Sequence, residues 1–416
     1  MGRRNMIEMK NSGIEWIGEI PAAWQVSKIK YFFDCLDGKR VPVDAGERIS
    51  GPYPYWGAGS VTDHVNDYLF DEELILLGED GAPFFDYTRP VAFLVNEKIW
   101  VNNHIHVLKP HRSVCPSYLV HYLNNVDYKT YINGSILNKL TQSNMNTIAF
   151  VVPPYEEQVR IAAFLDRKCA EIDAVIERTK ATIEEYKKLK QSIITEAVTK
   201  GIRGDRSMKE SGIEWIGEIP AEWDVVRIKT LFDYRNERND KPLEEVNLIS
   251  LYTDLGVVQH CDLEATTGNK ASNADGYKLV YEDDIVVNII LCWMGAIGRS
   301  AYTGVTSPAY DVYSPKEGTN TKFYHHLFRT QGFSGDCYKV GRGIMAMRWR
   351  TYSDQFRAIK VVAPPQEEQQ EIVDYLDKKC ADMDTLIARK TALLAEMESY
   401  KKSVIYEYVT GKKEVK

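Results

Sequence analysis

Two stretches of the chain carry apolar side chains at the spacing of a long α-helix. The first, residues 155–199, contains neither glycine nor proline and would extend roughly 65 Å as a helix. Pro153 and Pro154 precede it, and Glu156 and Glu157 occupy its first turn, where negative charge interacts favourably with the helix dipole. Heptad rows of mainly apolar residues follow in both stretches, containing Ile172, Val175, Ile176, Ile183, Leu189 and Ile193 in the first and Met383, Leu386, Ile387, Leu393, Leu394, Met397, Tyr400 and Val404 in the second.

An apolar stripe of this width needs a partner helix, and the pattern predicts that the two helices pack against each other as an intramolecular coiled coil. The first helix leads into the second half of the chain through a short linker around residues 201–207. The second helix starts from the end of that half, so it has to run back to meet the first. We therefore expect an antiparallel pair with a globular domain at each end and a pseudo-two-fold axis between them.

The rest of the chain also occurs twice. Residues 9–34 and 208–233 match at 19 of 26 positions without a gap, and both contain S-G-I-E-W-I-G-E-I-P-A-x-W. The openings of the two helices, P-P-Y-E-E-Q and P-P-Q-E-E-Q, align at an offset of 211 residues. A repeat on this scale predicts two copies of one structural plan. We interpret Trp16 and Trp24, with their second-copy equivalents, as packing each domain against its neighbouring helix rather than stacking on bases.

The copies diverge over residues 35–150 and 234–361, where short strand-like runs are separated by Gly, Pro and Asn. An acidic turn followed by an apolar run persists in both, as D-E-E-L-I-L at 71–76 and E-D-D-I-V-V at 282–287. The predicted fold class is mixed α/β (α+β), with two tandem globular domains joined by two long antiparallel helices. The expected boundaries are a first domain at 1–153, a first spacer helix at 154–200, a second domain at 201–364 and a second spacer helix at 365–416.

Composition places the chain among ordinary globular proteins. Its 416 residues are too many for one compact core, and 44% hydrophobic and 27% charged residues are typical values. No signal peptide or membrane-spanning run is indicated, so we expect a cytoplasmic location and no membrane partner. Seven cysteines without a C-x-x-C pair fit a reducing compartment, and Cys169 and Cys380 are interpreted as small buried apolar residues.

The net charge of −7 is unevenly distributed. In the first copy, residues 61–97 carry nine acidic residues against one arginine, whereas residues 98–140 carry five cations against one aspartate. The second copy repeats this asymmetry between residues 240–284 and 322–360. Because local fields decide whether a phosphate backbone can bind, the basic back half of each domain is a candidate nucleic-acid surface.

Motifs of catalysis are missing from the sequence. V-P-P-Y at 152–155 resembles the N-P-P-Y motif of amino-methyltransferases but lacks its asparagine, and the second copy reads A-P-P-Q, so helix initiation explains both. G-E-D-G-A at 78–82 lacks the lysine of a phosphate-binding loop. His104 and His106 have no further ligands at metal spacing. We expect no catalytic residue, no metal and no cofactor.

If the domains read DNA, planar donors and acceptors suit base edges and cations suit phosphates. The first domain offers W-V-N-N-H and L-N-K-L-T-Q-S-N, and the second offers G-R-G-I-M-A-M-R-W-R. Lys139 aligns with Arg350 at the offset of 211. The candidate DNA-binding residues are Asn102, Asn103, His104, Asn138, Lys139, Thr141, Gln142 and Asn144 in the first domain and Arg299, Arg342, Arg348, Trp349, Arg350 and Arg357 in the second.

Together these features resemble the specificity subunit of type I restriction-modification systems, the HsdS family, over essentially the whole chain. The resemblance is carried by both duplicated motifs and by the helix endings E-A-V-T-K-G at 196–201 and E-Y-V-T-G-K at 407–412. In that family, each of two target-recognition domains binds one half of a bipartite site on double-stranded DNA. The helices act as a spacer and dock two adenine methyltransferase subunits, and motor-nuclease subunits join this core. The resemblance implies a non-catalytic subunit with these partners, whereas the contact residues rest on chemistry alone.

Two other functions stay open from the sequence. One is a two-domain coiled-coil scaffold without DNA reading, and the other is a self-sufficient DNA-modifying enzyme. A DNA reader would bind DNA with a steep dependence on salt, whereas a scaffold would not bind it. A self-sufficient enzyme would transfer methyl groups without partner subunits.

Overall fold

The computed structural model describes residues 8–132, 138–260, 274–343 and 349–415. It divides into two compact units, of which unit 1 comprises Met1–Ala181 with Lys390–Lys416 and unit 2 comprises Thr182–Arg389. Each unit combines a globular domain with part of each long helix, α3 (Tyr155–Lys200) and α8 (Gln366–Val409). The two long helices predicted from the apolar spacing are therefore present.

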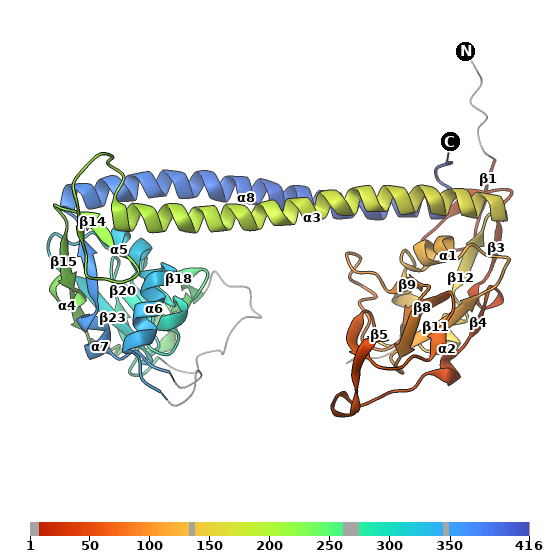
Figure 1. Cartoon of the computed structure of the whole chain (residues 1–416), viewed down its shortest axis with the longest axis horizontal. Helices are drawn as coiled ribbons and strands as arrows, with labels where there is room; N and C mark the ends of the chain where they lie inside the picture. The colour runs from red at the N-terminus through yellow and green to blue at the C-terminus, as the bar shows by residue number, and fades with distance from the viewer. Residues whose placement is uncertain (1–7, 133–137, 261–273, 344–348, 416) are drawn as a thin grey trace, which may run out of the picture. The chain divides into compact units, whose positions relative to one another are not determined.

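The main sheet of unit 1 has four antiparallel strands in the order β4-β11-β8-β9 (Figure 1). Strand β8 is buried at every residue, as predicted for an apolar run that follows an acidic turn. One face of the sheet shares a core with helix α1 and with the ends of α3 and α8. The strands are β4 (Phe33–Cys35), β8 (Leu74–Gly78), β9 (Ala92–Val95) and β11 (Ile105–Pro110).

Smaller elements surround this sheet. A second sheet with strand order β6-β5-β10-β7 shares a core with residues of the main-sheet strands β8, β9 and β11, and two further strand pairs join β1 to β2 and β3 to β12. These strands are β1 (Met9–Asn11), β2 (Glu19–Pro21), β3 (Gln25–Lys28), β5 (Ser50–Trp56), β6 (Val61–Val65), β7 (Phe70–Asp71), β10 (Lys98–Val101) and β12 (Ala149–Val152). The helices are α1 (Pro116–Leu123) and α2 (Gln142–Met145), with 3-10 turns η1 (Ile29–Tyr31), η2 (Asp37–Lys39), η3 (Ala45–Glu47) and η4 (Tyr128–Thr130).

Unit 2 repeats the plan. Its main sheet has the order β16-β23-β20-β21, which corresponds strand for strand to that of unit 1. The pairs β13-β14 and β15-β24 correspond to β1-β2 and β3-β12. The strands are β13 (Met208–Glu210), β14 (Glu218–Pro220), β15 (Asp224–Arg227), β16 (Phe232–Arg235), β20 (Ile285–Asn288), β21 (Ile297–Arg299), β23 (Tyr310–Pro315) and β24 (Lys360–Ala363).

The copies differ outside this common frame. Where unit 1 has its second four-stranded sheet, unit 2 has two strand pairs, β17-β18 and β19-β22. Unit 2 has the short helix α4 in place of η1 and, among the described residues between β23 and β24, the helices α5, α6 and α7. These elements are β17 (Ile249–Tyr252), β18 (Gly256–Gln259), β19 (Lys278–Val280), β22 (Gly304–Thr306), α4 (Ile228–Leu231), α5 (Thr321–Phe328), α6 (Gln331–Val340) and α7 (Ser353–Ala358), with η5 (Leu243–Glu245) and η7 (Cys292–Met294).

The tryptophans of the repeated block join each domain to the helix that follows it. Trp24, 2% exposed, donates from Nε1 to Glu157 Oε2 at 3.0 Å, and Trp223, fully buried, donates to Glu368 Oε2 at 2.9 Å. Both glutamates belong to the first turn of a long helix. The packing role predicted for these tryptophans is confirmed.

The glutamine of each P-P-x-E-E-Q motif makes a second joint. Gln158 Nε2 donates to the Pro153 carbonyl at 2.9 Å, and its Oε1 accepts from the Cys115 backbone N–H that precedes α1. Gln369 makes the same two bonds in unit 2, to the Pro364 carbonyl at 2.8 Å and from the Asn320 N–H at 3.0 Å. The motif therefore satisfies otherwise unpaired backbone groups at the starts of two helices.

The long helices run antiparallel in unit 1. The rings of Phe164 and Tyr408 lie 4.4 Å apart, and Asp173 binds Lys401 at 2.7 Å, so partner numbers on α8 fall as those on α3 rise (Figure 1). Val404 and Val409 of α8 share the core of the domain with Ile161 and other residues of α3.

The same direction holds in unit 2. Lys190 of α3 binds Asp384 of α8 at 2.6 Å, and Arg203, just beyond α3, binds Glu371 at 2.7 Å. Helix α3 ends before Gly201, whose φ of +73° is the left-handed conformation that closes many helices. The antiparallel direction predicted from chain connectivity is therefore confirmed within each unit. Among the described residues, no helix is both long and apolar enough to cross a membrane.

The glutamate that accepts the indole hydrogen bond is buried in unit 2 and half-buried in unit 1, so the two bonds can be compared directly. We expect Trp223→Phe to lower the free energy of unfolding by about 1–3 kcal/mol, because it leaves the buried Glu368 without its indole donor. The matched variant Trp24→Phe should cost less, since Glu157 is only half-buried and can bind water. Urea denaturation measures both. An equal or larger loss in Trp24→Phe would contradict this account.

Candidate nucleic-acid interface

The loop at residues 78–82 brings the two candidate stretches of the first domain together. The Gly81 N–H donates to the Asn138 carbonyl at 2.9 Å, and the Leu140 N–H donates to the Glu79 carbonyl at 2.9 Å. On its other side, the Glu79 N–H donates to the His104 carbonyl at 3.0 Å. The loop therefore joins the turn at 102–104 to the segment that starts at Asn138. The glycines of this loop do not form a phosphate-binding loop, and its role as a hub that joins the two stretches has no local signal in the sequence, because hydrogen bonds to distant segments create it.

The polar side chains around this hub differ in availability. Asn103, His104 and Gln142 are exposed, as a base-reading role requires. Asn102 accepts the His104 N–H at 2.8 Å, which shapes the turn before β11. Asn138 contributes its carbonyl to the loop bond and has a half-buried side chain.

Two other candidates of this segment have local structural contacts. Thr141 caps α2 by accepting the Asn144 N–H at 3.2 Å. Asn144 donates from Nδ2 to the Tyr131 carbonyl at 2.7 Å. Both side chains therefore hold the shape of the segment.

Lys139 is half-buried and already paired. Its Nζ lies 3.0 Å from Asp80 Oδ1 and 3.4 Å from Glu79 Oε1, and the hydrogen bond to Asp80 raises the pKa of Lys139. Lys98 and Lys109 likewise pair with Asp71 and Glu72. Cations of the basic half of this domain are thus partly neutralised by acids of its acidic half. The uneven charge along the sequence overstates the positive field at the surface.

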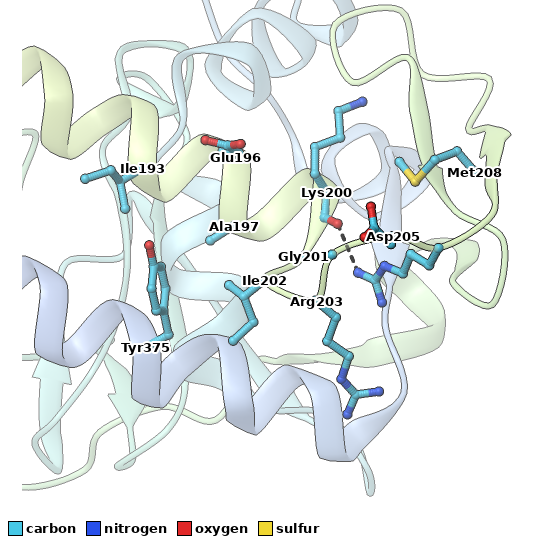
Figure 2. Close-up of a pocket in the computed structure, with 12 residues that line it drawn as sticks. Ile193, Glu196, Ala197, Lys200, Gly201, Ile202, Arg203, Asp205, Met208 and Tyr375 are labelled. Carbon is cyan, nitrogen blue, oxygen red and sulfur yellow. Dashed lines mark hydrogen bonds between the residues drawn. The ribbon is translucent and has the colours of Figure 1, made fainter.

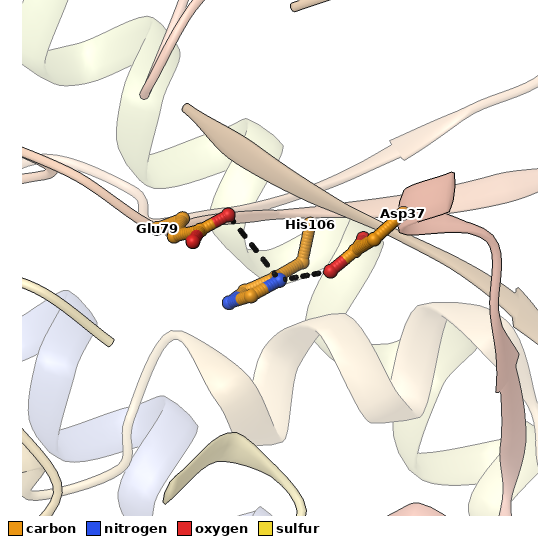
Figure 3. Close-up of side chains that lie close together, drawn as sticks. All are labelled: Asp37, Glu79 and His106. Carbon is orange, nitrogen blue, oxygen red and sulfur yellow. Dashed lines mark hydrogen bonds and ion pairs between the residues drawn. The ribbon is translucent and has the colours of Figure 1, made fainter. Parts of the chain in front are cut away.

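His106 lies beneath the hub in a buried cluster with Asp37 and Glu79 (Figure 3). Their ligand atoms all lie within 4.8 Å of one another, a spacing that would suit a divalent cation. Arg40 supplies positive charge to this cluster, since its Nη1 lies 2.6 Å from Glu79 Oε2 and its Nη2 lies 3.6 Å from Asp37 Oδ2. Because the protein's own cations already bind these carboxylates, we interpret the cluster as an ion-pair network.

In unit 2, the candidate residues form two sides of a β-bridge. Arg342 and Arg350 exchange both backbone hydrogen bonds at 2.9 Å, which brings the two arginines together. The side chain of Arg342 is exposed. Arg348 lies outside the described residues.

Trp349 stacks beside this bridge. Its ring lies 4.9 Å from that of Tyr338 at an interplanar angle of 20°, and its Nε1 donates to the Tyr338 carbonyl at 3.1 Å. Tyr338 is 49% exposed and also contacts Trp293 edge-on at 5.7 Å. The arginines therefore stand next to an aromatic cluster.

The remaining two candidates lie within the domain. Arg299 is bound by Asp283 and lies 3.7 Å from Glu282, the acids of the turn before β20. Arg357 of α7 is half-buried, and its Nε has no hydrogen-bond partner among the described residues.

A separate cavity of about 610 Å³ lies at the end of α3 in unit 2, lined by Ile193, Tyr375 and the linker (Figure 2). Its cations are engaged within the unit. Lys200 Nζ donates to the Ile216 carbonyl at 2.9 Å, and Arg203 pairs with Glu371. We interpret this cavity as part of the joint between α3 and the second domain.

Comparisons with known proteins agree with the repeated architecture. The family model of the type I restriction modification DNA specificity domain matches residues 21–185 and again residues 220–396. The putative type I restriction enzyme specificity subunit S.HindORF215P of Haemophilus influenzae is 24% identical over 349 residues, which cover 82% of this chain and 84% of that protein. The putative type I restriction enzyme MjaX specificity subunit of Methanocaldococcus jannaschii is 25% identical over 439 residues, which cover 96% of each.

A solved structure shares the fold. It is described as showing the structural basis of complex assembly and conformational transition of the type I R-M system. It superposes on this chain with a TM-score of 0.68 at 14% identity, over 95% of this chain and 99% of that one. The family model spans more than half of the sequence in two tandem copies. The chain therefore belongs to the family of type I restriction modification DNA specificity domains, as the sequence motifs predict.

Proposed function

We propose that this chain is the non-catalytic specificity subunit of a type I restriction-modification complex, in which each domain reads one half of a bipartite site on double-stranded DNA. The observation that carries the proposal is that one repeated frame holds two equivalent segments, around Leu140 and Thr351, and that each segment is surrounded by different polar groups. Unit 1 presents Asn103, His104 and Gln142, whereas unit 2 presents Arg342 and Arg350. Two readers of one shape but unlike chemistry suit a site with two unlike halves.

The backbone supports the equivalence of these places. In unit 1, Leu140 donates to the carbonyl of Glu79, which follows the buried strand β8. In unit 2, Thr351 donates to the carbonyl of Ile289, which follows the corresponding strand β20. Leu140 and Thr351 are related by the offset of 211 residues.

The polar side chains of the two domains differ in a way that predicts which bases each domain prefers. Arginine presents a planar fork that matches the O6 and N7 acceptors of guanine, whereas asparagine and glutamine match the edge of adenine. We therefore expect guanine preference in the half-site of unit 2 and a more adenine-directed preference in that of unit 1.

Four apolar residues on the heptad rows of the long helices, which we expected to face the partner helix, are instead exposed, and they form a candidate docking surface for two methyltransferase subunits, which motor-nuclease subunits would join. Val175 and Tyr400 of unit 1 are 45% and 48% exposed, and Leu189 and Leu386 of unit 2 are 49% and 40% exposed. The offset of 211 relates Val175 to Leu386 and Leu189 to Tyr400. A repeated set of exposed apolar side chains suits two identical partners.

The arginine pair tests DNA reading. In a complex reconstituted with the methyltransferase subunits, the double variant Arg342→Ala/Arg350→Ala should lose about tenfold in affinity and loosen base preference in one half-site only. Selection from duplexes with randomised half-sites measures the preference, and titration at several salt concentrations measures the electrostatic part. The control Lys209→Ala/Lys229→Ala removes the same charge from exposed positions outside the bridge. An unaltered preference in both half-sites would refute the assignment.

The helix face is tested separately. We expect Val175→Asp and Leu386→Asp each to remove one methyltransferase subunit from the complex and the double variant to remove both, because each places a charge in an apolar contact. Native mass spectrometry of the assembled complex counts the subunits. Lys188→Asp, at another exposed position of α3, serves as the control and should leave the stoichiometry unchanged. Full assembly of the double variant would exclude this face.

A further inference from the structure

The equivalent segments at residues 138–142 and 349–351, which we call reading segments 1 and 2, are held to their domains by different chemistry. Both make the same backbone bond to the end of a central strand. The side-chain and carbonyl contacts described for them differ. This difference has consequences for how each half-site is read.

Reading segment 1 is held by an imidazole. His106 is fully buried on β11, and its Nε2 lies 2.8 Å from the Leu140 carbonyl while its Nδ1 lies 2.6 Å from Asp37 Oδ2. A carbonyl can only accept, so Nε2 carries a hydrogen and donates it. Two lone pairs repel at 2.6 Å, so a second proton lies between Nδ1 and Asp37. His106 therefore links Asp37, on η2, to the backbone of the reading segment.

The Asp37 carboxylate of this link is also held by the backbone. The second oxygen of Asp37 accepts the Val107 N–H at 2.9 Å, which fixes the carboxylate against β11. The titratable and charged groups that face His106 and its partners are Cys35, Asp37, Arg40, Glu79, Asp80, His104 and Lys139.

Reading segment 2 is held by an indole. Trp349 stacks on Tyr338 and donates to its carbonyl, and a Cβ placed on Gly341 would lie 2.4 Å from Trp349 Nε1. The glycine therefore lets the indole pack against the backbone. Thr351, fully buried, donates from its hydroxyl to the Cys337 carbonyl at 3.0 Å. These contacts involve no ion pair.

The imidazole link has no equivalent among the described residues of unit 2. By strand register, His106 corresponds to Asp311 on β23. Asp311 binds Lys278 of the neighbouring strand β19 at 2.8 Å rather than reading segment 2.

We propose that His106 and Trp349 are the positioning residues of the two reading segments, so that recognition of one half-site depends on a buried hydrogen-bond link through an imidazole and recognition of the other depends on aromatic stacking. This inference rests on the proposed DNA-reading function. Neither residue has to touch DNA. Each sets the backbone from which side chains such as Gln142 and Arg350 reach it.

Paired variants at His106 test the link in the reconstituted complex. The amide of glutamine reaches the place of Nε2, whereas that of asparagine reaches the place of Nδ1. We therefore expect His106→Gln to keep most of the base preference in the half-site of unit 1, and His106→Asn to lose it by about fivefold or more. The other half-site should not change in either variant. Equal behaviour of the two variants, or loss in both half-sites, would overturn the inference.

The corresponding experiment for unit 2 uses Trp349→Ala, which removes the ring that stacks on Tyr338, and Trp349→Phe, which keeps an aromatic ring. We expect the alanine variant to loosen the half-site opposite to the one that His106→Asn loosens, and the phenylalanine variant to retain most of that preference. Loss of preference in the same half-site for both residues would contradict separate positioning. Absence of any sequence preference in the wild-type complex would instead refute the proposed function, so the two failures can be told apart.

Replacing Asp37 by the neutral asparagine provides a further check of the imidazole link. Burial alone would raise the pKa of Asp37, but the hydrogen bond and charge of His106, with the Val107 N–H and Arg40, lower it below its ordinary value. A lowered carboxyl pKa contributes stability that is present above the ordinary value near 3.8 and is lost as the pH falls through the folded value. Asp37→Asn can accept the Val107 N–H and donate to a neutral His106.

We therefore expect Asp37→Asn to keep both the base preference and the protection of the Leu140 amide against hydrogen exchange. In the wild-type protein, protonation of Asp37 contributes to a loss of amide protection below about pH 4, and this contribution should be absent from Asp37→Asn. In Asp37→Ala, the Leu140 amide should be less protected at every pH. Equal loss in Asp37→Asn and Asp37→Ala at neutral pH would overturn the link, even if other variants fail to fold.

Discussion

Each domain depends on a hydrogen bond between a buried indole and the first turn of a long helix. Trp24 and Trp223 come from the repeated block near the start of each domain, and Glu157 and Glu368 come from the helix that leaves it. The bond therefore closes the domain on itself, because the chain enters and leaves at the same place. The glutamine after each glutamate adds a second closure through the helix that follows the main sheet. Residues that recur in both copies thus serve the frame.

A frame closed in this way leaves the rest of the domain free to vary. Between the entry and exit, unit 1 builds a second four-stranded sheet, whereas unit 2 builds two strand pairs. The reading segments lie at the ends of corresponding strands, but one rests on an ion-pair network and the other on stacked rings. Divergent sequence within a fixed frame gives two surfaces of different chemistry without a change of fold. On the proposed function, two partners of one kind would bind the exposed apolar residues that recur on both helices.

Local signals in the sequence predicted much of this frame. The absence of glycine and proline after Tyr155 predicted α3, and apolar runs after acidic turns predicted the buried strands β8 and β20. Residues 25–35 form the strands β3 and β4 with η1 between them, and the burial of Ile29 in η1 depends on contacts from distant parts of the domain. The roles of Gly78–Ala82 and His106 could not be predicted, because hydrogen bonds between segments far apart in sequence create them. For the same reason, counting charges along the chain missed the ion pairs that neutralise Lys139.

The central claim, that each domain grips a different half of one DNA site, can be tested by photo-crosslinking in the assembled complex. A photoreactive amino acid at Asn103 of unit 1 and, in a second preparation, at Arg342 of unit 2 would be crosslinked to a duplex that carries the selected site. Sequencing of the crosslinked bases locates each contact. The account predicts that the two positions react with opposite halves of the site. Crosslinks from both positions to the same half, or none from either to the site, would contradict it.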